Sequence, residues 1–182
     1  MQRHLSIAAS VLALAAINAP AWAATPRQLY GKSVLISYTT TQMARTAGTN
    51  EPFHAQTFQK QLSVYISTTG RPFLRNTTTN RSGTGSIEQV GASGSTQLGQ
   101  PSSVQFRDQS LVITFVFLSG AIHVQADFGP DFTSCTTNVI RGIGTGNKTM
   151  TVKSLTGGIF EVQSSTTTGA TCTIRDGNVF AD

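Results

Sequence analysis

Two histidines and a few acidic residues are the side chains best suited to proton transfer in this chain. His54 follows Glu51 in a segment without hydrophobic periodicity, and His123 precedes Asp127 by four residues. A histidine beside a carboxylate is a common general acid–base pair. On a strand, four residues span roughly 13 Å, so His123 cannot bond Asp127 directly. We expect His123 to be a solvated strand residue. His54 is the better reactive candidate, although a loop histidine without a task is the simpler interpretation.

Motifs for other chemistries are absent or weak. The chain has no G-x-S-x-G sequence, which marks the nucleophile of many hydrolases. Asp127 and Asp131, in the segment ADFGPDF, could join backbone carbonyls around Ca²⁺. Because no third carboxylate is near in sequence, a turn stabilised by aspartate side chains is the favoured interpretation. We therefore predict no catalytic residue, no metal site and no cofactor.

Three arginines form a conceivable basic patch. Arg71 and Arg75 should point to the same side of one strand, and Arg81 follows. They could bind an anionic ligand or a polysaccharide, or they could keep an exposed sheet edge soluble. The formal net charge of the whole chain is +5, but no dense Lys/Arg run has aromatic residues interleaved with it. Nucleic-acid binding is therefore not expected.

The first 23 residues have the pattern of a secretory signal peptide. Arg3 is followed by an alanine-rich apolar run over residues 5–17, and Ala21-Trp22-Ala23 is a small-x-small cleavage site. The run is shorter than the ~20 apolar residues that a membrane-spanning helix needs. We expect cleavage after residue 23, no later transmembrane segment, and a location in the periplasm or outside the cell. The alanine-rich run is typical of bacterial signals.

Both cysteines of the chain, Cys135 and Cys172, lie in the part that remains after cleavage. In an oxidising compartment an even number of cysteines indicates a disulfide. The bond would close a loop of about 38 residues, which the chain-entropy model values at ~3–4 kcal/mol. A metal pair or a reactive thiol has less support, because the chain has no C-x-x-C and no histidine near either cysteine.

The segment from residue 102 to 128 predicts three consecutive antiparallel strands. Its middle part, residues 111–118, is almost wholly apolar, which predicts a strand buried on both faces. The flanking parts alternate apolar and polar residues, which predicts one face toward a core and one toward water. Asp108-Gln109 and Ser119-Gly120 are placed where two-residue hairpin turns would be.

Further short strands are expected along the remaining chain. They are predicted at residues 32–39, 58–67, 71–78, 133–140, 148–155, 159–165 and 171–175, with a short strand near 86–90. Long loops are predicted at about 40–57 and 80–101, where the periodicity is lost. Residues 24–182 should therefore form a single domain with nine or ten strands and no long helix.

The pattern predicts an all-β fold built as an antiparallel meander. An up-and-down barrel is favoured, because short turns join consecutive strands, and a two-sheet β-sandwich is the alternative. The segment Tyr30-Gly31-Lys32 resembles the start of calycin barrels such as lipocalins. Their characteristic tryptophan is missing, since Ser33 follows Lys32 and the only tryptophan is Trp22. The resemblance covers these few residues, and we assign no family from it.

These features favour an exported, non-catalytic domain that binds a small hydrophobic ligand, an extended ligand or a partner protein. In a barrel, Ile122, Val124, Ala126 and Phe128 would point inward and could line a ligand cavity, or simply fill the interior. One alternative is a hydrolase or isomerase that uses His54 or His123 with a carboxylate. Another is a surface or assembly protein that pairs through a strand edge.

Overall fold

A computed structural model describes residues 24–80, 86–92, 102–143, 149–153 and 158–180. The predicted signal peptide, residues 1–23, lies outside them. Within the described ranges, no helix has the length and apolar content needed to cross a membrane. A short 3₁₀ helix, η1 (Arg27–Leu29), precedes the strands. The strands are β1 (Lys32–Thr46), β2 (His54–Ile66), β3 (Pro72–Asn80), β4 (Ser86–Ala92), β5 (Ser102–Arg107), β6 (Ser110–Phe117), β7 (Gly120–Phe128), β8 (Cys135–Ile143), β9 (Met150–Lys153) and β10 (Ile159–Asp176).

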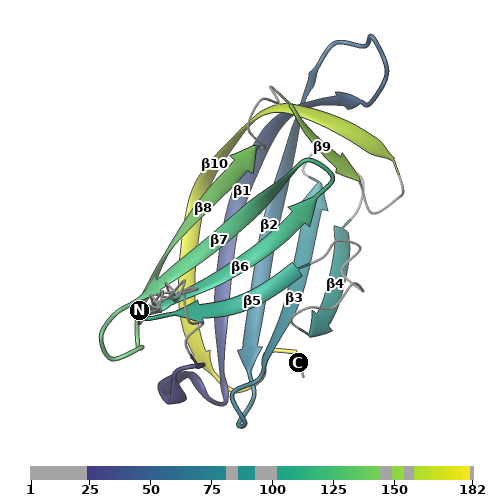
Figure 1. Cartoon of the computed structure of the whole chain (residues 1–182). Helices are drawn as coiled ribbons and strands as arrows, with labels where there is room; N and C mark the ends of the chain where they lie inside the picture. The colour runs from purple at the N-terminus through teal and green to yellow at the C-terminus, as the bar shows by residue number, and fades with distance from the viewer. Residues whose placement is uncertain (1–23, 81–85, 93–101, 144–148, 154–157, 181–182) are drawn as a thin grey trace, which may run out of the picture.

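The strands form two antiparallel sheets. The larger has the order β4-β3-β2-β1-β10-β9 and the smaller the order β5-β6-β7-β8. Figure 1 shows the four-stranded sheet lying across the front of the larger one. The all-β prediction is confirmed, and the two sheets fit the alternative, a sandwich. Closure into the favoured barrel is not found among the described strands, because β1 pairs with β10 while β5 to β8 pair only with one another.

The core lies between the two sheets. Side chains alternate between the faces of each strand, so every second residue of the central strands points inward. On β1, Val34 and Ile36 are buried, and on β2 their neighbours Val64 and Leu62 are buried. The four-stranded sheet contributes the buried side chains of Val104, Phe106, Leu111, Ile113, Phe115, Val124, Ala126 and Phe128. Fully burying one of the Val, Leu, Ile or Phe side chains among these contributes roughly 1.5–3 kcal/mol.

Strand β6 is buried on one face only. Leu111, Ile113 and Phe115 point into the core, whereas Val116 is 46% exposed on the other face. The prediction that residues 111–118 are buried on both faces is therefore wrong, because only one sheet packs against β6. The hairpin turn at Asp108-Gln109 is as predicted. The next turn lies one residue earlier than predicted, at 118–119.

The predicted loop at residues 40–57 is largely strand. β1 continues to Thr46 and β2 begins at His54, so the connection is only residues 47–53. The extensions pair with each other, and the hydroxyls of Thr41 and Thr57 share a 3.1 Å hydrogen bond across them. These extensions have polar side chains on both faces, so the sequence lacks the alternation of apolar and polar residues that predicts a strand. In the other predicted loop, 80–101, the short strand near 86–90 is present as β4; residues 81–85 and 93–101 lie outside the described residues.

The last strand, β10, is continuous where two strands and a turn were predicted. At Gly169 and Ala170 the pairing with β1 shifts by one residue, so that these two residues oppose Tyr38 alone. Gly169 has a φ of +61°, which glycine adopts without steric cost. The predicted turn is thus a β-bulge, in which the strand bends but does not reverse.

The predicted disulfide is present and links the two sheets. Cys135 is the first residue of β8 in the four-stranded sheet, and Cys172 lies on β10 in the six-stranded sheet. Both cysteines are half-buried and pack against the core. The bond therefore ties the edge of the small sheet to the large one.

Candidate functional site

The outer face of the four-stranded sheet brings together the polar residues of β6 and β7. Register places Ser110 opposite Asp127 and Thr114 opposite His123. Val112 lies between these two rows, opposite Gln125. All of these positions alternate with buried ones, so their side chains point away from the core.

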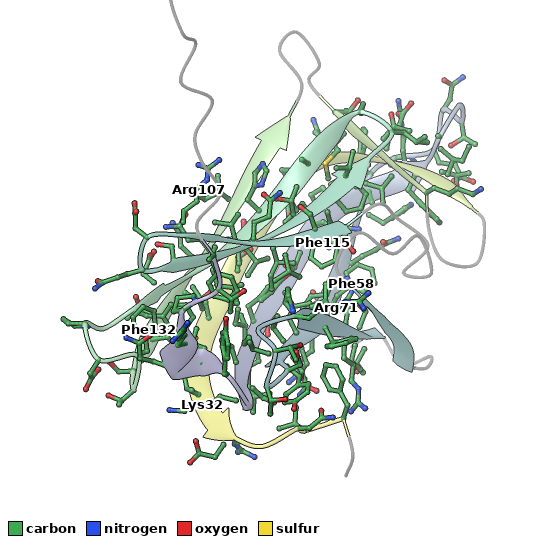
Figure 2. All side chains as sticks on the ribbon, turned by 60° about the horizontal axis from the view of Figure 1, so that its bottom comes forward. Lys32, Phe58, Arg71, Arg107, Phe115 and Phe132 are labelled. Atoms are coloured by element: carbon green, nitrogen blue, oxygen red, sulfur yellow. A yellow bond between two sulfur atoms is a disulfide. The ribbon has the colours of Figure 1, made fainter. Side chains whose placement is uncertain are left out.

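Apart from Asp127, these side chains line a depression of about 480 Å³ that is open to solvent. Arg107, labelled in Figure 2, extends from the end of β5 at one side of the depression. The lining residues are Gln105, Arg107, Asp108, Ser110, Val112, Thr114, His123, Gln125 and Ile140. The depression thus contains both hydrogen-bonding and apolar groups.

The Asp127 carboxylate is held by its neighbours on the sheet. One of its oxygens, Oδ1, accepts hydrogen bonds from Ser110 Oγ at 2.5 Å and from Gln125 Nε2 at 2.7 Å. These bonds fix the carboxylate along the sheet surface at the end of the face that also carries Arg107. This end of the face is therefore polar and charged, and the position of its Asp127 carboxylate is fixed.

His123 is bonded to a threonine and not to a carboxylate. Its Nδ1 and the hydroxyl of Thr114 share a hydrogen bond of 2.9 Å. Asp127 lies two rows away on the same face, as the sequence spacing predicted. Among the described side chains, no ion pair joins His123 to an acid. The geometry therefore supplies no histidine–carboxylate pair here.

The other end of the same face is apolar. Ile140 of β8 lies beside His123 in the cross-strand register, and it is 46% exposed. Val116 of β6 is equally exposed, and Leu118 in the following turn is 63% exposed. Exposed apolar side chains gathered on one face mark interaction surfaces more often than isolated ones do.

His54 does not form the reactive pair that the sequence allowed. It is the first residue of β2, it is exposed, and it pairs with Ala44. Glu51 is exposed in the preceding connection. In the described part of the chain, no hydrogen bond or ion pair connects the two side chains. His54 is thus a surface residue at a strand end.

Arg71 and Arg75 lie on the outer face of the larger sheet, beside aromatic rings. Arg71 is labelled in Figure 2. Its guanidinium group lies over the Phe73 ring, 5.4 Å from the ring centroid. Arg75 stands over the Phe180 ring at 4.7 Å and donates hydrogen bonds to the carbonyls of Val179 and Phe180, at 3.4 and 3.1 Å. Arg75 therefore fastens the C-terminal segment to β3. Arg81 lies outside the described residues.

The residues predicted to line a ligand cavity lie at the sheet interface. Val124, Ala126 and Phe128 are buried in the core, and Ile122 is half-buried against it. None of the four lines the depression on the outer face. A second depression, of about 400 Å³, lies between β8 and β10 and is lined by Thr137, Asn138, Val139, Ser165, Thr166, Thr167 and Ala170.

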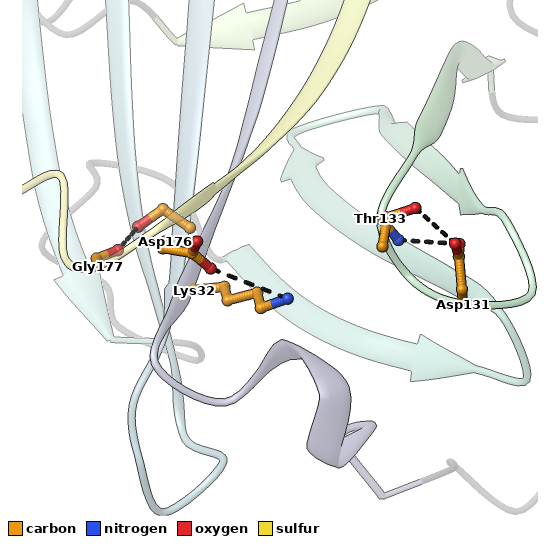
Figure 3. A network of polar contacts seen from close by, with 6 residues as sticks. Lys32, Asp131, Thr133, Asp176 and Gly177 are labelled. Atoms are coloured by element: carbon orange, nitrogen blue, oxygen red, sulfur yellow. Dashed lines mark hydrogen bonds and ion pairs between the residues drawn. The ribbon is translucent and has the colours of Figure 1, made fainter.

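Asp131 stabilises a turn, as its sequence context favoured. Its two carboxylate oxygens accept hydrogen bonds from the Thr133 amide, at 3.1 Å, and from the Thr133 hydroxyl, at 2.7 Å (Figure 3). These bonds lower the pKa of Asp131, and Lys32, which pairs with Asp176 at 3.9 Å, lowers it slightly further. No group of three or more potential metal-ligating side chains occurs within the described ranges.

The sequence did not show that the outer face of the four-stranded sheet, here called the four-stranded face, has a polar end and an apolar end. The available signal was Thr114, the one polar side chain within residues 111–118, which indicates the outward parity of β6. That parity also places Val112 and Val116 outward, although both are apolar. Which side chains of β7 and β8 join them depends on register, which a single strand does not encode.

Comparison with known proteins assigns no relative to this chain. No family model, no curated protein and no solved structure matches it. The residues of the chain itself must therefore indicate its function.

Proposed function

We propose that this protein is an exported, non-catalytic binding domain that holds an extended segment of a partner protein. The segment would lie on the outer face of the four-stranded sheet. The observation that carries the proposal is the depression on this face, where exposed apolar side chains adjoin an ordered polar end. A partner segment with apolar residues followed by a charged or amide residue matches both ends.

Two features support export. The first 23 residues have the signal-peptide pattern, and the disulfide between Cys135 and Cys172 fits an oxidising compartment. The periplasm or the cell exterior would provide that compartment.

Binding is favoured over catalysis because of how His123 and Asp127, two of the titratable side chains of the face, are held. His123 bonds Thr114, and Asp127 bonds Ser110 and Gln125. A hydrolase or isomerase would need the imidazole and a carboxylate within hydrogen-bond reach of each other or of one substrate atom. His123 and Asp127 are two rows apart, so they could contact different residues of an extended partner segment.

Selection from a displayed library of random peptides tests the proposal. The mature protein, residues 24–182, is the bait, and enriched peptides are measured against a variant that carries Val112→Glu and Ile140→Glu. Both substitutions add charge to the apolar part of the depression without touching the core. We expect enriched peptides to contain apolar residues and to lose at least about tenfold in affinity for this variant.

A matched control places a charge on the opposite sheet. Gln61→Glu changes an exposed residue on the outer face of β2, and peptide affinity should stay within about twofold of wild type. The absence of any enriched peptide would contradict the proposal. Equal loss of affinity in both variants would also contradict it, because the binding site would then not be on the four-stranded face.

A further inference from the structure

The outer face of the six-stranded sheet carries a regular array of uncharged polar side chains, which we call the hydroxyl face. Its centre is on β1 and β10. Ser37, Thr39 and Thr41 of β1 lie opposite Thr171, Thr168 and Thr166 of β10. These positions alternate with buried Ile36, Tyr38 and Thr40. The hydroxyl face is therefore directed away from the core.

Strand β2 extends each row of the hydroxyl face. Gln61, Gln59 and Thr57 lie opposite the same three residues of β1 on its other side. Hydrogen bonds link neighbours within two of the rows, between the hydroxyls of Ser37 and Thr171 at 2.8 Å and between those of Thr41 and Thr57 at 3.1 Å. Thr166, Thr168 and Thr171 are exposed. The side chains are thus ordered across strands and still accessible to a ligand.

The hydroxyl face contains no charged side chain in these three rows of β1, β2 and β10, although the whole chain has a net charge of +5. Hydroxyl and amide groups both donate and accept hydrogen bonds. A ligand with many hydroxyl groups satisfies such a surface, whereas an anionic ligand would leave its charge unpaired there. The chemistry of the face therefore selects for an uncharged, polyhydroxylated ligand.

Aromatic rings lie beyond one end of the hydroxyl face. Tyr65 of β2 is two rows beyond Gln61, and its ring stacks on Phe73 of β3 at 6.4 Å between centroids. Both residues are half-buried; Arg71 lies over the Phe73 ring, and the Phe180 ring packs edge-on against Tyr65. A sugar ring presents C–H groups on its faces and hydroxyls at its rim, and an amphipathic tyrosine beside hydroxyl groups complements both.

We propose that the hydroxyl face binds an uncharged polysaccharide. The site is on the opposite sheet from the proposed partner-segment site, so the inference goes beyond that function and does not depend on it. A single flexible polymer chain fits better than a crystalline surface such as ice. Neighbouring strands are rotated by roughly 20–25°, and the bulge at Gly169 adds to the twist, so the array does not repeat as a flat lattice.

Affinity electrophoresis tests the proposal directly. The mature protein is run under native conditions, toward the cathode, through gels that contain hydroxyethylcellulose, mixed-linkage β-glucan, mannan or dextran, and through a gel with anionic alginate. The test variant carries Thr39→Val, Thr168→Val and Thr171→Val, which remove hydroxyls but keep β-branched side chains. The control variant carries Thr136→Val, which removes an exposed hydroxyl from the other sheet.

We expect at least one neutral polysaccharide to retard the wild type and the Thr136→Val variant equally. The triple variant should bind it about tenfold or more weakly, because several hydrogen bonds are lost together. A companion variant, Tyr65→Phe, should keep most of the affinity, and Tyr65→Leu should lose it.

Three results would overturn the proposal. The first is no retardation by any of the four neutral polysaccharides. The second is retardation that the triple variant retains, or that only alginate produces and salt abolishes. The third is inhibition of ice recrystallisation that is lost in the triple variant while no polysaccharide binds, because the ligand would then be the ice lattice.

Discussion

At the scale of single residues, Asp131 shows how one neighbouring side chain lowers the pKa of a carboxyl group. The Thr133 hydroxyl donates to its carboxylate and lowers the pKa of Asp131, with the Thr133 amide as the next cause. A folded-state pKa below the unfolded value of about 3.9 contributes stability at higher pH. That contribution is lost as the pH falls through the folded-state pKa.

Replacing Thr133 tests this assignment. Thr133→Val removes the hydroxyl donor and leaves the amide, so the pKa of Asp131 should rise toward its ordinary range. Carboxyl-carbon NMR titration of Asp131 measures it, with Thr136→Val as the control that should not move the value. An unchanged pKa in Thr133→Val would show that the hydroxyl bond is not the main cause.

Two residues of β6 test which of its faces is buried. Ile113 is fully buried and Val116 is 46% exposed, on opposite faces of the strand. We expect Ile113→Ala to lower the free energy of unfolding by about 2–5 kcal/mol and Val116→Ala by less than about 1 kcal/mol. Urea denaturation measures both. Similar losses in the two variants would restore the prediction that β6 is buried on both faces.

At the scale of elements, the bulge in β10 depends on one glycine. Gly169 has a φ of +61°, and no atom lies within 4 Å of where its Cβ would be. The loss of unfolding free energy on replacing Gly169 should therefore depend on the backbone conformation alone. Gly169→Ala should cost about 1–2 kcal/mol in unfolding free energy, and Gly169→Asn less, because asparagine tolerates this conformation. Equal stability of wild type and Gly169→Ala would contradict the bulge.

The disulfide gives a second test at this scale, because it joins β8 to β10 across the two sheets. A variant with Cys135→Ala and Cys172→Ala should keep its β-type circular dichroism spectrum, since the core does not depend on the bond. Its free energy of unfolding should fall by ~3–4 kcal/mol in urea denaturation. Loss of the folded state at all conditions would mean that the two sheets do not hold together by packing alone.

Individual strands were predictable from the sequence where one face is apolar. Val34, Ile36 and Tyr38 alternate with Ser33, Leu35 and Ser37, and β1 was expected around them. The extensions of β1 and β2 were not expected, because Thr41 and its neighbours are polar on both faces. Pairing was not predictable either: Ser37 bonds Thr171, 134 residues away, and period-two patterns do not specify such partners.

The candidate site was predictable only in part. His123 was correctly placed on an outward strand position, two rows from Asp127. The apolar end of the same face was missed, because Val116 and Ile140 look like core residues in sequence and become surface residues only when one sheet lacks a covering layer. Arg75 looked like a ligand-binding cation, but it contacts the C-terminal segment, which no local pattern indicates.

At the scale of the whole molecule, two sheets pack around an apolar interior and leave two different outer faces for binding. The four-stranded face is part apolar and part charged, and the hydroxyl face is uncharged. A protein with both could attach to a polysaccharide on one side and hold a partner on the other. We predict that ligands bind to the outer faces and do not enter between the sheets.

Methyl NMR of residues 24–182, with and without a peptide selected as described above, shows where the ligand binds. Val112 and Ile140 report on the outer face of the four-stranded sheet, and Ile113 and Val124 report on the interior of the same sheet. We predict that the methyl shifts of Val112 and Ile140 change on binding while those of Ile113 and Val124 stay nearly constant. Larger changes at Ile113 and Val124 would place the ligand between the sheets and contradict the account.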